Sequence, residues 1–356
     1  MNREAQVQDF LKTISKSEGD GFKGDEQAIL EEYVKKDANR SGLAIKIMSV
    51  LGGFLATIAF LGFLFIAGLY DSDMGLLLFG SIFIGAAIWL NKVFDKLIID
   101  TLSISMYIIG LLLLGFGMAQ FNTNEDLITI SIIAIGAGTL MLTQTYVLSF
   151  ITFLTIAVGT LVLMMSNFLY DFIHLYNTCV MVLLTYVVLN EAKIITMGKK
   201  MSRLYDPIRI GLAVALLVGL VCIGKRDLIP ISIDYVWVSA IPALFIVIYL
   251  VYRIIKILGI ENLRDKILIY SLTTLILATT IFSPSILGAM VLVLLSFLVN
   301  YKTSFALGIV ALAYFISQYY YDLGFTLLTK SMILFSTGLV FILCYVLSNK
   351  KRNEKI

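Results

Sequence analysis

The chain has 356 residues, of which 59% are hydrophobic and only 14% are charged; an ordinary soluble domain is about 25% charged. Its mean hydropathy is +0.94 and its formal net charge is +3. A soluble core of this length cannot hide so much apolar surface, so most of the chain must lie in a bilayer. The composition excludes a disordered chain, a coiled coil and an ordinary cytosolic enzyme, and the small net charge gives no support for nucleic-acid binding.

A polar leader, residues 1–42, precedes the first apolar stretch. Apolar residues recur at helical spacing near its start, glycines interrupt the pattern between residues 18 and 25, and a second helix should begin near Asp25. The leader carries 7 basic and 9 acidic side chains, which disfavours a nucleic-acid interface. We expect a cytoplasmic helical hairpin that lies against the membrane or docks a partner. Because the apolar stretch that follows is long, it predicts a membrane helix and not a removed signal peptide.

Twelve apolar stretches predict an all-α, polytopic transmembrane helix bundle of about twelve spans, with ten as the lower alternative, over residues 43–347. The fourth and tenth stretches are short for a crossing, and each could form a re-entrant or tilted hairpin with the stretch that follows. If the chain were two six-span halves, these two would correspond, as at some transporter sites, but the halves show no residue-level similarity. The stretches are Leu43–Leu69, Gly75–Leu90, Leu102–Gln120, Leu127–Leu142, Tyr146–Met165, Ile173–Leu189, Ile208–Ile223, Tyr235–Leu258, Ile267–Phe282, Ile286–Val299, Ser304–Tyr321 and Phe325–Leu347.

The distribution of lysine and arginine predicts the orientation. With the N-terminus inside, all of the 27 basic residues fall in inner segments except Lys225, Arg226 and Lys330. Both termini, including the basic tail at 348–356, are therefore expected in the cytoplasm. The ten-span alternative predicts the same orientation, because removing a whole hairpin keeps the number of crossings even. The basic loop at 199–203 is expected to bind anionic lipid headgroups.

Catalytic and metal-binding motifs are absent from the sequence. There is no GxxxxGK[ST] loop and no HExxH, the single histidine cannot build a histidine metal cluster, and each of the three cysteines lies inside an apolar stretch. We therefore expect no enzyme activity, no cofactor and no metal. His174 has two interpretations, an interfacial histidine in a turn or a proton-linked residue. Gln144 is either a residue of a tight inner turn or the tip of a re-entrant hairpin, and then a pore or site residue.

The segment from Tyr319 to Ser331 joins the last two stretches at the outer face. Lys330 lies about five residues into an apolar span, roughly 8 Å at the helical rise, and must snorkel outward or find a partner. Asp322 is the nearest acid in sequence, and a break at Gly324 could bring the two together. Two interpretations stay open, a snorkelling lysine among interfacial tyrosines and a partnered functional lysine. The candidate functional residues here are Lys330, Asp322, Tyr319, Tyr320, Tyr321 and Thr326.

Three segments carry a resemblance to a known family. They are the stretch from Leu51-Gly-Gly-Phe-Leu-Ala to Gly68-Leu-Tyr-Asp-Ser, the stretch Ala87-Ile-Trp-Leu-Asn-Lys, and the Tyr-Tyr-Asp and Thr-Leu-Leu-Thr-Lys-Ser elements between 319 and 331. Over most of 43–347 the chain resembles the bacterial domain of unknown function 4401 family. The resemblance implies a polytopic inner-membrane protein, often associated with a second protein named for a GDYxxLxY stretch. It implies no known activity and no role for Lys330 or Asp322.

Three classes of function follow from these observations. The first is a small-molecule transporter or lipid-handling protein, in which Lys330 could hold a carboxylate or a phosphate headgroup. Intramembrane carboxylates are nearly absent, which disfavours a proton- or cation-coupled pump. The second is a non-catalytic accessory or scaffold subunit of a membrane complex, suited by the short loops and the helical leader. A membrane enzyme is the weakest, because no acid–base or nucleophile set can be assembled.

Overall fold

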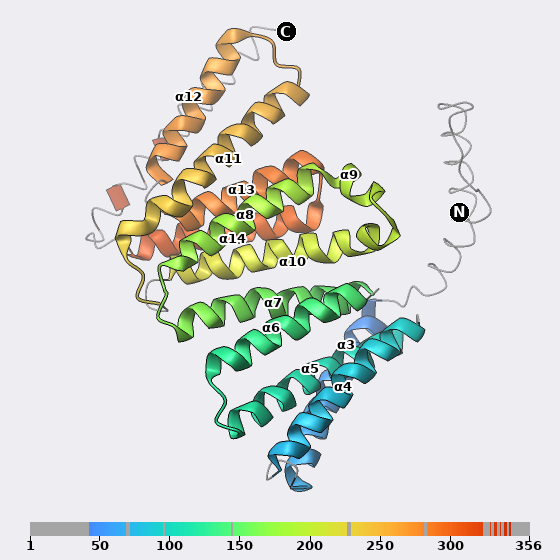
Figure 1. Ribbon diagram of the computed structural model, residues 1–356. Coiled ribbons are helices and arrows are strands. Elements are labelled where there is room, and N and C mark those ends of the chain that lie inside the picture. The colour runs from blue at the N-terminus through green and yellow to red at the C-terminus, as the bar shows by residue number, and fades with distance from the viewer. Residues whose placement is uncertain are drawn as a thin grey trace, which may run out of the picture. The chain divides into compact units, whose positions relative to one another are not determined.

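The computed structural model describes residues 43–322, except 69–71, 95–96, 144, 226–228 and 281–282, together with a few isolated positions after 322. Every regular element in this part of the chain is a helix (Figure 1). The leader, the twelfth apolar stretch as a whole and the basic tail lie outside the described residues. The helices are α3 (Leu43–Ile66), α4 (Asp73–Val93), α5 (Leu97–Gln120), α6 (Glu125–Leu142), α7 (Tyr146–Ser166), α8 (Phe172–Leu189), α9 (Glu191–Thr196), α10 (Lys199–Gly224), the 3-10 turn η3 (Ile233–Tyr235), α11 (Val236–Ile257), α12 (Leu263–Thr280), α13 (Pro284–Val299) and α14 (Lys302–Asp322).

The first eleven predicted stretches each coincide with a helix, so the all-α prediction is confirmed. By length and composition, eight described helices can cross a bilayer. Leu55–Leu64 and Pro284–Val299 are shorter apolar helices. The exact number of spans and the side on which the termini lie therefore stay predictions. The eight are Asp73–Val93, Ile99–Gln120, Glu125–Leu142, Tyr146–Ser166, Phe172–Leu189, Lys199–Gly224, Val236–Ile257 and Lys302–Tyr321.

Helix α11 illustrates why these helices belong in lipid. One face is buried and small or aliphatic, with Ala240, Ala243, Val247 and Leu250 packed inside. The opposite face is exposed and equally apolar, and includes Trp237, Ile241, Phe245, Ile248 and Tyr252. A helix on the surface of a soluble protein would be polar on that outer face. An apolar outer face is what a bilayer requires.

The chain divides into two compact units, residues 1–159 and 160–356, with the division inside α7. In unit 1, α4 and α5 run side by side in close contact (Figure 1). A Cβ on Gly80 would come 2.8 Å from the backbone nitrogen of Leu114, and one on Gly110 would come 2.9 Å from the carbonyl oxygen of Gly80. Only glycine permits this approach, and small residues are the usual means of bringing membrane helices together.

In unit 2, α13 is the central helix and contacts α8, α10, α11, α12 and α14. Ten of its 16 residues are buried, and Leu287 and Val291 are completely so. Gly288 lets Leu220 of α10 pack against the α13 backbone, since a Cβ there would come 2.6 Å from a Leu220 methyl carbon. At 1.5 Å per residue the helix is about 24 Å long, less than the roughly 30 Å of a hydrocarbon core. This short tenth stretch is therefore enclosed by other helices.

The two units do not correspond to two six-span halves. Helix α8, the sixth stretch, packs against α10, α11 and α13, which all belong to unit 2. The division also falls before α8 and not in the polar break between the sixth and seventh stretches. That break contains the short helix α9, and α10 then begins at Lys199, nine residues before the predicted apolar stretch.

Candidate functional site

His174 is the third residue of α8 and is completely buried, at 0% exposed. His174 therefore lies in a helix and not in a turn, while its two interpretations, interfacial and proton-linked, stay predictions. The turn lies just before it, where Asp171 accepts a hydrogen bond from the backbone N–H of Ser232 at 2.8 Å. The face of α8 that carries Ile173, His174 and Asn177 is buried in unit 2. The ring thus sits among packed helices, in the first turn of α8.

The hydrogen bonds around His174 are consistent with one tautomer, in which Nδ1 carries the proton. Its Nδ1 lies 2.8 Å from Oγ of Ser239 on α11. With the one hydrogen of the Ser239 hydroxyl directed to the carbonyl of Val236 at 3.2 Å, the hydroxyl accepts from Nδ1–H. The other ring nitrogen, Nε2, then offers a lone pair. It is buried and has no hydrogen-bond partner among the described residues.

Asn177 offers a second free acceptor on the same face of α8. Its Nδ2 donates to the carbonyl of Ile173 at 3.1 Å, and its Oδ1 is buried without a partner in the described part of the chain. It stands three positions after His174 in the helix, so the two side chains are neighbours. The Tyr176 hydroxyl between them in sequence is also buried and lacks a described partner. The carboxamide lies against Gly219 of α10, where a Cβ would come 2.9 Å from Cγ of Asn177.

These groups form one level of unit 2, which we name the polar layer: His174, Tyr176, Asn177, Ser239 and Ser285. The beginnings of α8, α11 and α13 meet the end of α10 here. Oγ1 of Thr178 donates to the carbonyl of Val238 at 3.0 Å, and Oγ of Ser285 donates to the carbonyl of Leu220 at 3.0 Å. The layer can accept hydrogen bonds. In the described part of the chain no group of three or more His, Cys, Asp or Glu side chains could hold a metal ion.

A second buried polar group surrounds Arg209, in the first half of α10. Its guanidinium lies 3.5 Å from the centroid of the Tyr301 ring and 2.8 Å from a carboxylate oxygen of Asp206, and the residue is only 8% exposed. The hydroxyls of Tyr205 and Tyr301 are 3.4 Å apart. Burial raises the pKa of the Tyr301 hydroxyl, and Glu191 and Tyr205 raise it further. This arrangement fixes the turn between α13 and α14 against α10.

Sequence reasoning missed the role of Arg209, which it counted only as an inner positive charge. The sequence did indicate these contacts, because Tyr205 and Asp206 stand four and three residues before Arg209, which is the spacing of neighbours on one helix face. It was overlooked because the helix was predicted to start at Ile208.

The structure describes only part of the C-terminal candidate segment. Tyr319, Tyr320 and Tyr321 form the last turn of α14 before Asp322, and the rings of Tyr320 and Tyr321 lie 5.7 Å apart. Tyr321 is 73% exposed. Thr326 and Lys330 lie outside the described residues. The pairing of Lys330 with Asp322 therefore remains a prediction.

Gln144 also lies outside the described residues, but its neighbours are well held. Oγ1 of Thr143 and Oγ of Ser149 are 3.1 Å apart. Nδ2 of Asn91, on α4, donates to Oγ1 of Thr145 at 2.5 Å. These bonds tie Thr143 to α7 and Thr145 to α4, and both interpretations of Gln144 stay predictions.

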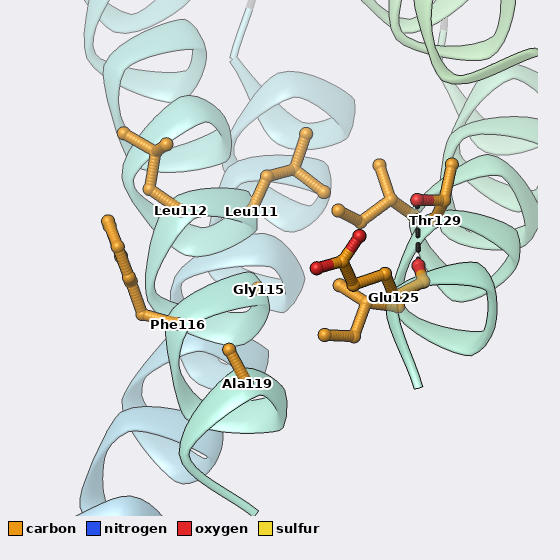
Figure 2. Close-up of a pocket in the computed structure, with 9 residues that line it drawn as sticks. Leu111, Leu112, Gly115, Phe116, Ala119, Glu125 and Thr129 are labelled. Atoms are coloured by element: carbon orange, nitrogen blue, oxygen red, sulfur yellow. Dashed lines mark hydrogen bonds between the residues drawn. The ribbon is translucent and has the colours of Figure 1, made fainter. Parts of the chain in front are cut away.

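A groove runs along α5 and α6 in unit 1 (Figure 2). Its volume is about 340 Å³ and its walls are almost entirely apolar. The carboxylate of Glu125 points from α6 toward α5 across it, while Oγ1 of Thr129 is bonded to the backbone carbonyl of Glu125 at 2.9 Å (Figure 2). The lining residues are Leu111, Leu112, Gly115, Phe116, Ala119, Glu125, Ile128, Thr129 and Ile132.

Apolar helices that expose apolar faces and enclose a few buried polar side chains are typical of a multi-pass helical membrane protein. The sequence profile of the family described as domain of unknown function (DUF4401) matches residues 42–351. The chain belongs to this family, and the resemblance seen in the sequence is confirmed. That description assigns no activity. No curated protein and no solved structure is detectably similar to the chain.

Proposed function

We propose that this protein is a membrane carrier, without enzymatic activity, that binds a small hydrogen-bonding solute at the polar layer. The observation that carries the proposal is the pair of buried acceptors, Nε2 of His174 and Oδ1 of Asn177, which have no partner among the described residues. Intramembrane polar groups usually face a bundle interior or a water-filled path, and they mark the routes of substrates and ions.

Buried atoms of this kind lower the stability of the folded protein. A buried polar group without a hydrogen bond costs about 1–3 kcal/mol. The other polar side chains around the layer meet a carbonyl or another side chain: Ser239, Thr178 and Ser285 all do. Three members of the layer, His174, Tyr176 and Asn177, keep a buried polar atom without a partner among the described residues, and His174 and Asn177 lie three residues apart on α8. A solute that donates two hydrogen bonds would remove both costs at once.

The chemistry of the layer restricts the solute class. Two lone pairs favour a neutral or cationic molecule with N–H or O–H donors, because an anion would find two acceptors and only the Tyr176 hydroxyl as a donor. Asp171, three residues before His174, adds negative charge next to the layer. The hypothesis that Lys330 holds a carboxylate or phosphate headgroup requires a second site, separate from the polar layer.

The cellular setting is part of the proposal. The lysine and arginine distribution supports a bacterial cytoplasmic membrane protein with both termini inside. The basic start of α10, with Lys199, Lys200 and Arg203, is suited to anionic headgroups. A partner of the GDYxxLxY type is the association that the family resemblance implies. The alternative function is an accessory or scaffold subunit for such a partner.

The test uses the full chain in nanodiscs and compares wild type with Asn177→Leu and Thr185→Val. Thr185 is a matched control, because it is buried on α8 and its hydroxyl is already bonded to the carbonyl of Met181 at 2.8 Å. Without solute, Asn177→Leu should melt above wild type, since an apolar side chain removes the unmet acceptor. At least one of methylammonium, urea and glycerol should raise the Tm of wild type and of Thr185→Val but not of Asn177→Leu.

Two results would contradict the carrier. One is a wild-type Tm that does not respond to any of the three solutes, while Asn177→Leu still melts higher; the polar layer would then be a packing defect. The other is stoichiometric co-purification of a second membrane protein whose contact with this chain satisfies the layer. That result would favour the accessory-subunit function.

A further inference from the structure

The groove between α5 and α6 is independent of the polar layer and belongs to unit 1. Its walls are leucine, isoleucine, phenylalanine and small residues, and one charged side chain, Glu125, stands at one end (Figure 2). The groove exists because α5 presents Gly115 and Ala119 where larger side chains would fill it. A Cβ on Gly115 would meet only a terminal carbon of Ile132 at 3.8 Å, which is ordinary contact.

The dimensions of the groove suit an acyl chain in one leaflet. Along α5 the lining runs from Leu111 to Ala119, and eight residues of helix rise about 12 Å. One leaflet contributes about half of the roughly 30 Å hydrocarbon thickness. The end that carries Ala119 and Glu125 is next to the α5–α6 turn, where the chain leaves the apolar region. The apolar part of the groove therefore lies at the depth of lipid tails and the carboxylate at the depth of headgroups.

The charge at this end selects among headgroups. Glu125 is the first residue of α6, and its side chain is directed into the groove instead of back over its own helix (Figure 2). A phosphate or glycerol headgroup would bring a negative charge or none toward this carboxylate, whereas a primary ammonium brings a positive charge and three donors. Electrostatic complementarity of this kind sets specificity more than affinity.

We propose that the groove is a lipid site, in which an acyl chain lies along Gly115 and Phe116 and the ammonium of a phosphatidylethanolamine-type headgroup pairs with Glu125. The site does not depend on the proposed carrier function, since it shares no residue with the polar layer. Under this proposal unit 1 binds a lipid whose headgroup carries a primary amine.

The experiment measures which lipids remain bound. The full chain is placed in nanodiscs containing equal amounts of phosphatidylethanolamine and phosphatidylglycerol, and tightly held lipids are counted by native mass spectrometry. An exposed ion pair is worth up to about 1 kcal/mol, so wild type should retain phosphatidylethanolamine over phosphatidylglycerol by about threefold to fivefold. Glu125→Gln should reduce this preference to near unity. Asp126→Asn, the matched control on the next residue, should keep it, because Asp126 does not line the groove.

A second variant tests the apolar part of the site. Gly115→Leu places a side chain in the groove, and it favours the helix, since leucine has a higher helix propensity than glycine. This variant should fold at least as well as wild type and retain one fewer lipid of either headgroup. The proposal is overturned if Glu125→Gln keeps the wild-type preference, or if Gly115→Leu, folded by its Tm, retains the wild-type number of lipids.

Discussion

The carboxamide of Asn177 lies directly against the backbone of Gly219, so that α8 and α10 meet at a position where α10 has no side chain. A Cβ on Gly219 would come 2.9 Å from both Cγ and Nδ2 of Asn177, and closer still to Oδ1. The amide cannot swing away without losing its bond to the carbonyl of Ile173. Gly219 is therefore the residue that admits a polar side chain into this helix interface.

Gly219→Ala is expected to destabilise the protein by about 1–3 kcal/mol, because the added methyl group overpacks the interface. The measurement is unfolding of the purified protein in mixed micelles. Gly138→Ala is the matched control: nothing lies within 4 Å of a Cβ there, so it should be neutral or slightly stabilising. Combining Gly219→Ala with Asn177→Ala should recover much of the loss, whereas strict additivity of the two substitutions would argue against the contact.

Tyr301→Leu should cost about 1–2 kcal/mol, because it removes a ring stacked on a buried guanidinium at 3.5 Å. Arg209→Lys should lose a similar amount, since an ammonium cannot stack as a planar group does. Tyr249→Leu is the comparison, because Arg253 lies 5.7 Å from that exposed ring and its loss should change little. Equal effects at Tyr301 and Tyr249 in the same unfolding assay would contradict the structural role of Arg209.

The Tyr301 hydroxyl predicts a loss of stability at alkaline pH. Its pKa in the folded protein is raised above the ordinary value of 10.0. The folded state therefore holds the proton more tightly, and the stabilisation is fully present below the unfolded pKa and is lost as pH rises through the folded pKa. Between pH 10 and 11 the wild type should lose stability faster than Tyr301→Phe. Tyr235→Phe, at an exposed tyrosine, serves as the control and should follow the wild-type slope.

Leu287→Ala should destabilise by about 1–3 kcal/mol, because α13 is central and this side chain is completely buried. The cost is smaller than in a soluble core, since lipid replaces water in the unfolded reference and only packing is lost. Phe245→Ala, on the exposed face of α11, removes a larger side chain and should cost less. The reverse order of the two values would show that α13 is not enclosed by the other helices.

The orientation is tested with reporter fusions. Green fluorescent protein at the C-terminus should fluoresce and alkaline phosphatase there should be inactive, as the inner excess of lysine and arginine predicts. Alkaline phosphatase fused after Asn167, in the turn between α7 and α8, should be active, because an odd number of predicted spans, five, precedes it. An active phosphatase at the C-terminus would require an odd number of crossings.

The helices of this protein follow from local sequence properties. Long apolar runs fix where a chain enters and leaves lipid, and backbone groups in lipid must be hydrogen-bonded within the segment, so each run must be helical. For this reason the limits of α6 and α11 agree with the predicted stretches within about two residues. The start of α10 was missed because the residues from Lys199 to Pro207 are mostly polar; in the structure this segment is helical and Tyr205 contacts Tyr301.

Which helix faces meet is decided by the tertiary structure. His174 was visible as the single histidine, and Tyr176 and Asn177 were its neighbours in sequence, but nothing local indicated Ser239, 65 residues away, as its partner. The same holds for Gly219 beside Asn177 and for Glu125 across from Gly115. Hydropathy is nearly uniform around these helices, so it carries no signal about which side faces lipid and which faces protein. Small residues and buried hydrogen bonds set that choice, and they act only once the helices are packed.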